Sequence, residues 1–303
     1  MAAVAFSILA AFGFASSAVL SRQGMQAIFP LPGVMVSLLF SLIFASIMAL
    51  VFAFSDIGSI PQAAFFWIVG LGLLNYLGGR SQNFLSVNLI GASRASLFVA
   101  SQAPFAALFA VTFTGETLHP LVGLGTAGVV GGLIFASGTS ILEGWRGDKM
   151  FVLGYLMALG AGASYGATNV MAKQTLEVFD SPLIITSLSM MVGIVVLAPL
   201  VGASAAHSGV IRAKGQGFTT NLWAVRWVAL AGIASGIAVI SLYFAVQRAD
   251  VVVISPIVSS SPLITLLFSH LFLSRLEQVT KRLVFGAMLT VGGVVLVVLG
   301  SQL

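Results

Sequence analysis

The stretch Gly33-Val-Met-Val-Ser-Leu-Leu-Phe-Ser-Leu-Ile-Phe-Ala-Ser-Ile-Met-Ala-Leu-Val-Phe-Ala-Phe54 decides the fold class of this chain. It is apolar throughout, apart from three serines, and carries no charge. A helix needs about 20 such residues to cross roughly 30 Å of hydrocarbon. A strand of a membrane barrel would instead alternate polar and apolar residues over a shorter length. We therefore predict a membrane-spanning helix here.

The composition extends this prediction to the whole chain. Of its 303 residues, 59% are hydrophobic and only 7% are charged, whereas about 25% are charged in an ordinary soluble protein. The net charge of +5 comes from 13 scattered basic residues, and there is no cysteine. These features exclude a soluble enzyme, a nucleic-acid binder and a disulfide scaffold. The first apolar run has no charged segment ahead of it, so we expect a retained span rather than a cleaved signal.

Breaks at clusters of Pro, Gly, Asp and basic residues divide the chain into ten apolar segments. The connections between them are short, so we expect the function to lie within the membrane. The longest connection, from Ala203 to Trp223, is polar and is interpreted as a solvated loop. The ten predicted spans cover residues 3–24, 33–54, 63–85, 91–113, 120–139, 150–173, 182–202, 224–246, 251–273 and 281–300.

The two halves of the sequence resemble each other. Arg22-Gln23 recurs as Lys173-Gln174, Pro104 recurs as Pro262, and Gly131-Gly132 recurs as Gly292-Gly293. Each repeat has five spans. Because five is an odd number of crossings, the second copy must enter the membrane from the side opposite to the first. We predict an all-α polytopic membrane protein with ten transmembrane helices in two inverted five-helix repeats, residues 1–145 and 146–303. This plan is common in secondary transporters.

Two segments also resemble a known family. Residues 94–118, RASLFVASQAPFAALFAVTFTGETL, are followed by a Gly-rich span and look like the fourth and fifth helices of EamA-type members of the drug/metabolite transporter superfamily. The second copy, from Pro262 to Gly286, is similar but has Ser274 where the first has Glu116, with the acid displaced to Glu277. The resemblance implies helices 1–4 and 6–9 around a central cavity, with helices 5 and 10 outside. It implies no particular substrate.

The third predicted span carries a polar face. On a helix, Gly72, Asn75, Tyr76, Gly79, Gln82 and Asn83 recur at spacings of three and four. Such a face in lipid must line a cavity or bond to neighbouring helices, because an unpaired polar group in hydrocarbon costs several kcal/mol. Arg80 follows Tyr76 by one turn and could present its guanidinium to a carboxylate or phosphate. The alternative is that Arg80 extends to the lipid headgroups.

The first and sixth spans offer matched positions. Arg22 and Lys173 would lie near opposite membrane faces, either as symmetric gate or entrance charges or as headgroup anchors. Tyr165 and Asn169 lie deeper and could contact substrate or only a neighbouring helix. The substrate-binding residues that we predict are Asn75, Tyr76, Arg80, Gln102, Tyr165, Asn169 and Tyr243.

Pro104 and Pro262 fall in the middle of their predicted spans. A proline there removes one backbone hydrogen bond, so we expect a kink at each, acting as a hinge between access states. Proline is also common in membrane helices that gate nothing. The glycine-rich runs, such as Gly128 to Gly132, have small-xxx-small spacings that favour internal helix packing over dimerisation.

Acidic residues are absent from the middle of every predicted span, and His270, in the ninth, is the only histidine within a predicted span. Histidine is the side chain whose ordinary pKa lies nearest to neutral pH. No phosphate-binding loop, metal-ligand spacing or nucleophile elbow is present. We therefore expect no enzyme activity, no cofactor and no metal.

The leading interpretation is a secondary transporter or facilitator for a small polar or amphipathic metabolite, with amino-acid export as one possibility. The alternatives are a subunit of a lipid-linked sugar flippase and a non-transporting scaffold. We expect a small-molecule substrate, a lipid bilayer as the surroundings, no nucleic acid, and a monomer or weak homodimer in a bacterial inner membrane. The orientation of the chain in the membrane stays open. The family resemblance favours cytoplasmic termini, whereas the distribution of Lys and Arg between the two sides favours termini outside the cytoplasm.

Overall fold

The computed structural model describes residues 2–114, 120–137, 149–211, 222–248, 257–258 and 260–300. Within these ranges the regular structure is entirely helical. The predicted all-helical fold class is therefore confirmed.

The described residues of the first half form nine helical elements. They are α1 (Ala2–Gly24), α2 (Pro30–Phe52), the short 3₁₀ helix η1 (Phe54–Ser59), α3 (Gln62–Gly72), the π-helix η2 (Leu73–Arg80), α4 (Ser81–Ile90), α5 (Ala92–Val99), α6 (Gln102–Thr114) and α7 (Pro120–Ser137). Elements α3, η2 and α4 follow one another without a break and form one long helix with a widened middle.

The second half continues with five described helices. They are α9 (Lys149–Val178), α10 (Pro182–Ile211), α11 (Leu222–Arg248), α13 (Ser261–Phe272) and α14 (Lys281–Gly300). Helix α10 continues to Ile211, so the prediction of a loop from Ala203 onward is wrong for residues 203–211, which are helical. The segment before Ser260 in the ninth predicted span lies largely outside the described residues.

Seven helical stretches of the described chain are long and apolar enough to cross a membrane. Two shorter apolar helices, Pro120–Ala136 and Ser261–Phe272, add to them. Many large apolar side chains on these helices are exposed, among them Phe52, Phe66 and Leu222, at 72–76%. Such a surface fits contact with lipid tails, and the chain is an integral membrane protein.

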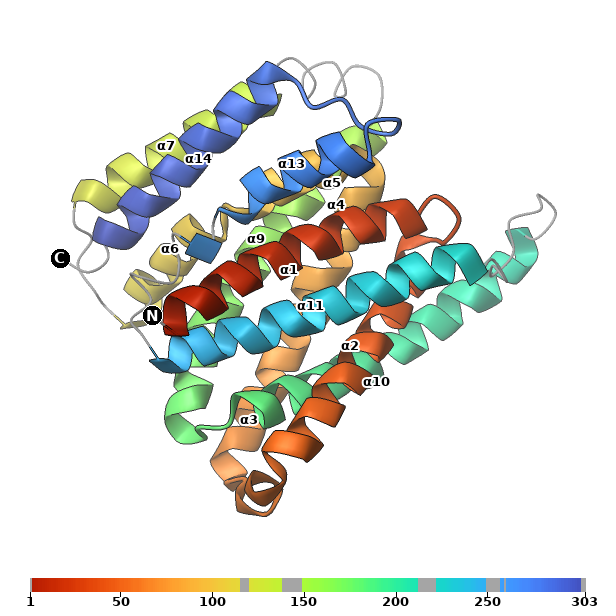
Figure 1. The fold of residues 1–303 in the computed structure, drawn as a ribbon, viewed down its shortest axis with the longest axis vertical. Helices are drawn as coiled ribbons and strands as arrows, with labels where there is room; N and C mark the ends of the chain where they lie inside the picture. Colours follow the sequence, from red (N-terminus) through yellow and green to blue (C-terminus); the bar gives the residue numbers. More distant parts are fainter. Residues whose placement is uncertain are drawn as a thin grey trace.

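Helices from the two halves of the chain alternate in space. In Figure 1, α1 lies beside α11, α2 lies near α10, and α7 pairs with α14 at one side of the bundle. Helix α9 packs against η2, α4, α5 and α6. The interior of the bundle is therefore built from both halves, and a residue buried there contacts partners far away in the sequence.

Glycines allow the closest of these helix contacts. A Cβ atom on Gly125 or Gly132 of α7 would overlap the backbone of α14, and one on Gly286 or Gly293 of α14 would overlap α7. Similarly, a Cβ on Gly13 of α1 would lie 2.9 Å from a carbonyl of α11. The glycine-rich runs serve internal packing in this structure, as their spacing predicted.

Candidate functional site

A widened helix turn lies in the middle of the third predicted span. Residues Leu73–Arg80 form a π-helix, a rare form that occurs often at functional sites. Two adjacent glycines bring α9 close to it: a Cβ on Gly78 would lie 2.7 Å from the Ser164 hydroxyl, and one on Gly79 would overlap the Tyr165 ring. The Ser81 hydroxyl donates to the Tyr76 carbonyl at 2.9 Å and satisfies one acceptor in the irregular turn.

Arg80, the last residue of this turn, is buried inside the bundle. Only 4% of it is exposed, so the alternative that its guanidinium reaches the headgroups is wrong. Its Nη2 donates to Ser37 Oγ at 2.6 Å and to Ser41 Oγ at 3.0 Å, both on α2. The Ser41 hydroxyl in turn lies 2.6 Å from the carbonyl oxygen of Gly232 on α11. Arg80 therefore connects the third span to α2 and, through Ser41, to the second half of the chain.

The other side of the Arg80 guanidinium has no partner. Its Nη1 is buried without a hydrogen bond, and the described part of the chain places no carboxylate within 4.0 Å of it. A buried charge without a counter-ion is expensive in an apolar medium. This arrangement leaves a donor available to a bound anion.

Two tyrosines lie near Arg80, and a third lies near one of them. Tyr76 of η2 and Tyr165 of α9 are close enough to interact electrostatically with the guanidinium, and Tyr243 of α11 interacts with Tyr76. Asn75 and Ser189 approach the Tyr76 hydroxyl, although no pair there meets the geometry of a hydrogen bond. The hydroxyls of Tyr76 and Tyr243 are buried and have no hydrogen-bond partner in the part of the chain that the structure describes. We call Asn75, Tyr76, Arg80, Tyr165 and Tyr243 the Arg80 cluster.

Five of the seven predicted substrate-binding residues thus lie together in the Arg80 cluster. The structure does not bring the other two into it. Gln102 is the first residue of α6, where its backbone faces Gly162 and Gly166 of α9. Asn169 is exposed within α9, well away from its ends.

The two prolines lie at the starts of described helices rather than at kinks in the middle of a helix, which corrects the expected geometry. Helix α5 ends at Val99, and Pro104 lies in the first turn of α6. Pro262 likewise lies in the first turn of α13. A first-turn residue has no intrahelical acceptor for its N–H, so proline removes no hydrogen bond there and its fixed φ suits the helix start.

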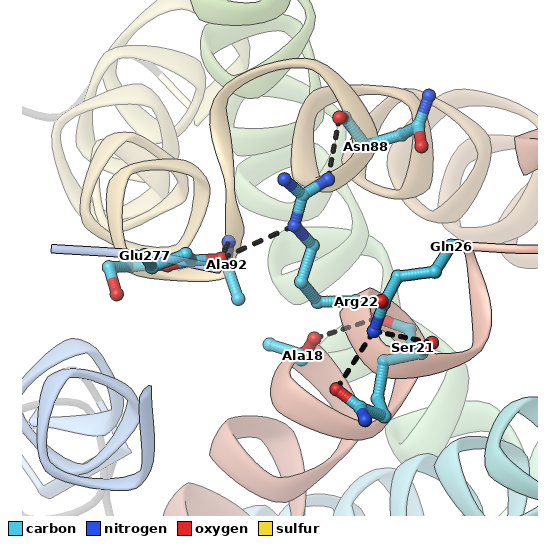
Figure 2. Close-up of polar contacts among 9 residues, drawn as sticks. Ala18, Ser21, Arg22, Gln26, Asn88, Ala92 and Glu277 are labelled. Carbon is cyan, nitrogen blue, oxygen red and sulfur yellow. Dashed lines mark hydrogen bonds and ion pairs between the residues drawn. The ribbon is translucent and has the colours of Figure 1, made fainter. Parts of the chain in front are cut away.

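A second polar cluster holds the end of α1, as Figure 2 shows. Arg22 Nη1 donates to the carbonyl oxygen of Asn88 on α4 at 2.7 Å, and Arg22 Nε lies 3.5 Å from Glu277 Oε1. Both side chains are largely covered, at 23% and 9% exposure. Arg22 is therefore held by protein groups, and the alternative that it is a free headgroup anchor is wrong.

Glu277 also caps the start of α5. Its Oε1 accepts from the Ala92 N–H at 2.6 Å and its Oε2 from the Ser93 N–H at 3.0 Å. A carboxylate at a helix N-terminus satisfies free N–H groups and interacts well with the helix dipole. The preceding Gly91 has φ +90, which turns the chain sharply between α4 and α5. We call Arg22, Glu277 and the N-terminus of α5 the Arg22 latch.

Lys173, the predicted counterpart of Arg22, has a different environment. It is exposed on α9, and within the described residues it forms no ion pair. Glu116, Glu143, Asp148 and Asp250 lie outside the described residues. The described residues thus place one charge pair at the Arg22 end, whereas Lys173 presents its charge to the surroundings. At the same end of α9 as Lys173, the Ser181 hydroxyl of the second half donates to Asp56 of the first half at 2.8 Å.

Sequence reasoning missed the serines that hold Arg80 and the acid that caps α5. Ser37 and Ser41 are one helical turn apart in an apolar span, and that spacing is the only signal they gave. Glu277 appeared only as a displaced acid. Among the described residues, no group of three or more His, Cys, Asp or Glu side chains could hold a metal ion.

Comparison with known proteins agrees with this architecture. The sequence profile of the EamA-like transporter family matches residues 1–138 and residues 152–299. A solved structure described only as "Crystal structure of protein" is 20% identical, covers 99% of this chain and 97% of its own, and has a TM-score of 0.61. At that identity the likeness supports the fold alone. No curated protein matches the chain.

Proposed function

This chain belongs to the EamA-like transporter family, and from that membership we propose that it moves a small polar or amphipathic metabolite across the membrane by alternating access. Members of the family are membrane transporters of the drug/metabolite type, not enzymes. The observation that carries the proposal is the Arg80 cluster, a charged and hydroxyl-rich centre buried among helices from both halves of the chain.

Burying polar groups without hydrogen bonds costs free energy, and a bound ligand that accepts those hydrogen bonds would offset the cost. In the described ranges of the chain, Arg80 Nη1 and the hydroxyls of Tyr76 and Tyr243 are buried without hydrogen-bond partners. Each unsatisfied polar group costs about 1–3 kcal/mol, and more when it is charged. A packed apolar core would avoid that cost, so a bound polar molecule is the natural use for these groups.

The proposed architecture is ten spans in two inverted repeats, residues 1–145 and 146–303. Support comes from the packing, because the pairs repeat when the two halves are exchanged. Helix α1 packs on α11 and α13, and its counterpart α9 packs on the third span and on α6. The two segments that the family profile matches, residues 1–138 and 152–299, fall within these boundaries.

The proposed motion opens one end while the other closes. The Arg22 latch joins α1, α4 and α5 of the first half to Glu277 of the second, which suits a closed end. Lys173 is exposed near the opposite end. In the second state the latch separates and the Lys173 end closes. The proposed gate charges are therefore Arg22 and Lys173, and the helix starts at Pro104 and Pro262 are the proposed hinges.

Counterflow in proteoliposomes tests the transport proposal. Purified protein is reconstituted with an unlabelled metabolite inside, and uptake of the labelled form is followed across a panel of amino acids, organic acids and sugars. We expect accumulation that depends on the trapped metabolite and is lost in Arg80→Gln. A panel that gives no more flux than liposomes with heat-denatured protein would overturn the proposed function. A bacterial inner membrane is the proposed location, so the liposomes are made from bacterial phospholipid.

A further inference from the structure

The charges around Arg80 point to the kind of substrate. Resting on the transport function proposed above, we propose that the Arg80 cluster binds an organic oxyanion, a carboxylate or a phosphate ester, in preference to zwitterions and cations. This narrows the earlier interpretation, in which amino-acid export was one possibility.

The available groups are donors. Within the described residues no atom accepts the two hydrogens on Arg80 Nη1, and the Tyr76 hydroxyl, which lies near the guanidinium and has no partner there either, can donate one more. The Arg80 Nη2 atom is already held by Ser37 and Ser41, so the guanidinium is fixed in position while Nη1 stays free. A fixed donor set of this kind matches a ligand group with several acceptor oxygens.

The missing groups are acids. Four acids fall within the described residues, and each lies near a helix end. Asp56 accepts from Ser181, Asp180 accepts from Gln247, Glu277 belongs to the Arg22 latch, and Glu177 is exposed near the end of α9. None lies within 4.0 Å of Arg80. An ammonium bound next to Arg80 would therefore meet a positive charge and no described carboxylate.

Charge balance leads to the same preference. Serine hydroxyls solvate the guanidinium but leave its positive charge in the apolar interior. A bound anion neutralises that charge. A zwitterion also brings an ammonium group, which must lose its water without gaining a partner, and a cation adds a second positive charge. The expected order of affinity is thus anion, then zwitterion, then cation.

A matched set of four-carbon compounds tests the order. Butyrate, butyl phosphate, γ-aminobutyrate and butylamine share the same chain length and differ in their charged groups. Binding to the purified protein in detergent is followed by thermal stabilisation, and counterflow is measured in parallel. We expect butyrate or butyl phosphate to bind at least about tenfold more tightly than γ-aminobutyrate, with butylamine weakest. Comparison of the two anions decides between carboxylate and phosphate.

Variants link the preference to Arg80. Arg80→Gln should remove the tenfold preference and Arg80→Lys should keep part of it, since an ammonium preserves the charge but not the planar fork. Arg94→Gln is the matched control, because Arg94 lies against the Phe151 ring, away from the cluster. If Arg80→Gln does not fold, Tyr76→Phe removes one donor beside the guanidinium and should weaken anion binding several-fold.

The result that would overturn the inference is equal or tighter binding of γ-aminobutyrate or butylamine. An anion preference that survives in Arg80→Gln would do the same. Failure of the transport function looks different: the anion preference would be present in the binding assay while counterflow stays at the background of empty liposomes.

Discussion

Replacing Glu277 with Ala should open the Arg22 end of the protein. The carboxylate accepts two N–H groups of α5, at 2.6 and 3.0 Å, and lies 3.5 Å from Arg22. In a partly exposed position each hydrogen bond to the carboxylate contributes about 1 kcal/mol net, and the ion pair contributes less. The closed state should therefore lose about 2 kcal/mol, which is a roughly 30-fold shift toward the open state.

Cysteine accessibility measures that shift, because the chain has no native cysteine. A probe at Ser17, which is 8% exposed, lies about 7.5 Å deeper along α1 than Arg22. We expect the Ser17→Cys probe to react with a membrane-impermeant maleimide many times faster when Glu277→Ala is present. A Thr168→Cys probe in the second half should become slower, because opening one end closes the other.

Glu177→Ala is the matched control for this experiment. Glu177 is an exposed acid on α9 that forms no ion pair among the described residues, so its removal should leave both labelling rates unchanged. Glu277→Gln keeps an acceptor oxygen for α5 and should give a smaller shift than Ala. If the Glu277→Ala protein is folded and its Ser17 probe reacts at the original rate, the Arg22 latch is only a structural contact and does not gate.

Three further predictions follow from the structure. Gly193→Ala places a Cβ 2.7 Å from the Tyr76 Cβ, so it should lower the melting temperature by several degrees and reduce flux. The control is Gly202→Ala on the same helix, whose Cβ meets no atom within 4 Å; thermal unfolding and counterflow should both be unchanged in that variant. Pro104→Ala and Pro262→Ala should change the free energy of unfolding by less than about 1 kcal/mol, because each proline lies in the first turn of its helix. If these positions are hinges, the same variants should slow the exchange between the two access states, measured by cysteine labelling from each side. Unchanged exchange rates would show that the prolines serve packing only. Flux should persist without a pH gradient, because no predicted span has an acid near its middle; flux that vanishes without the gradient and is unaffected by His270→Gln would contradict this.

Much of the fold could be predicted because lipid imposes a simple rule. Apolar runs such as residues 33–54 must be helical, since a backbone in hydrocarbon has to satisfy its own hydrogen bonds. The glycine pairs also predicted where helices touch. The positions of helix breaks were harder to predict, because Pro104 looks the same in a sequence whether it kinks one helix or begins another. The difference depends on the turn at Ala100 and Ser101, which tertiary packing decides.

The candidate site was only partly accessible to sequence reasoning. The polar face of the third span identified Asn75, Tyr76 and Arg80, and the matched positions of the first and sixth spans drew attention to Tyr165. Periodicity could not identify Ser37 and Ser41, since serines in an apolar span more often bond to their own helix. Glu277 lies further from Pro262 than Glu116 lies from Pro104, so an alignment on the prolines made the second acid look displaced. Counted from the glycine pairs, it precedes Gly292 by the same distance as Glu116 precedes Gly131.

The widened turn at Leu73–Arg80 has a consequence for how the sequence can change in length. Elsewhere in a membrane helix, loss of one residue rotates everything beyond it by about 100° and turns buried faces toward lipid. A π-helix already contains surplus backbone relative to the regular spiral. Loss of one residue there returns the backbone to α geometry and leaves α3 and α4 in their present rotations. This turn is thus the place in the third span where an insertion or deletion can be absorbed, and where relatives of different span length can keep the same outer helices.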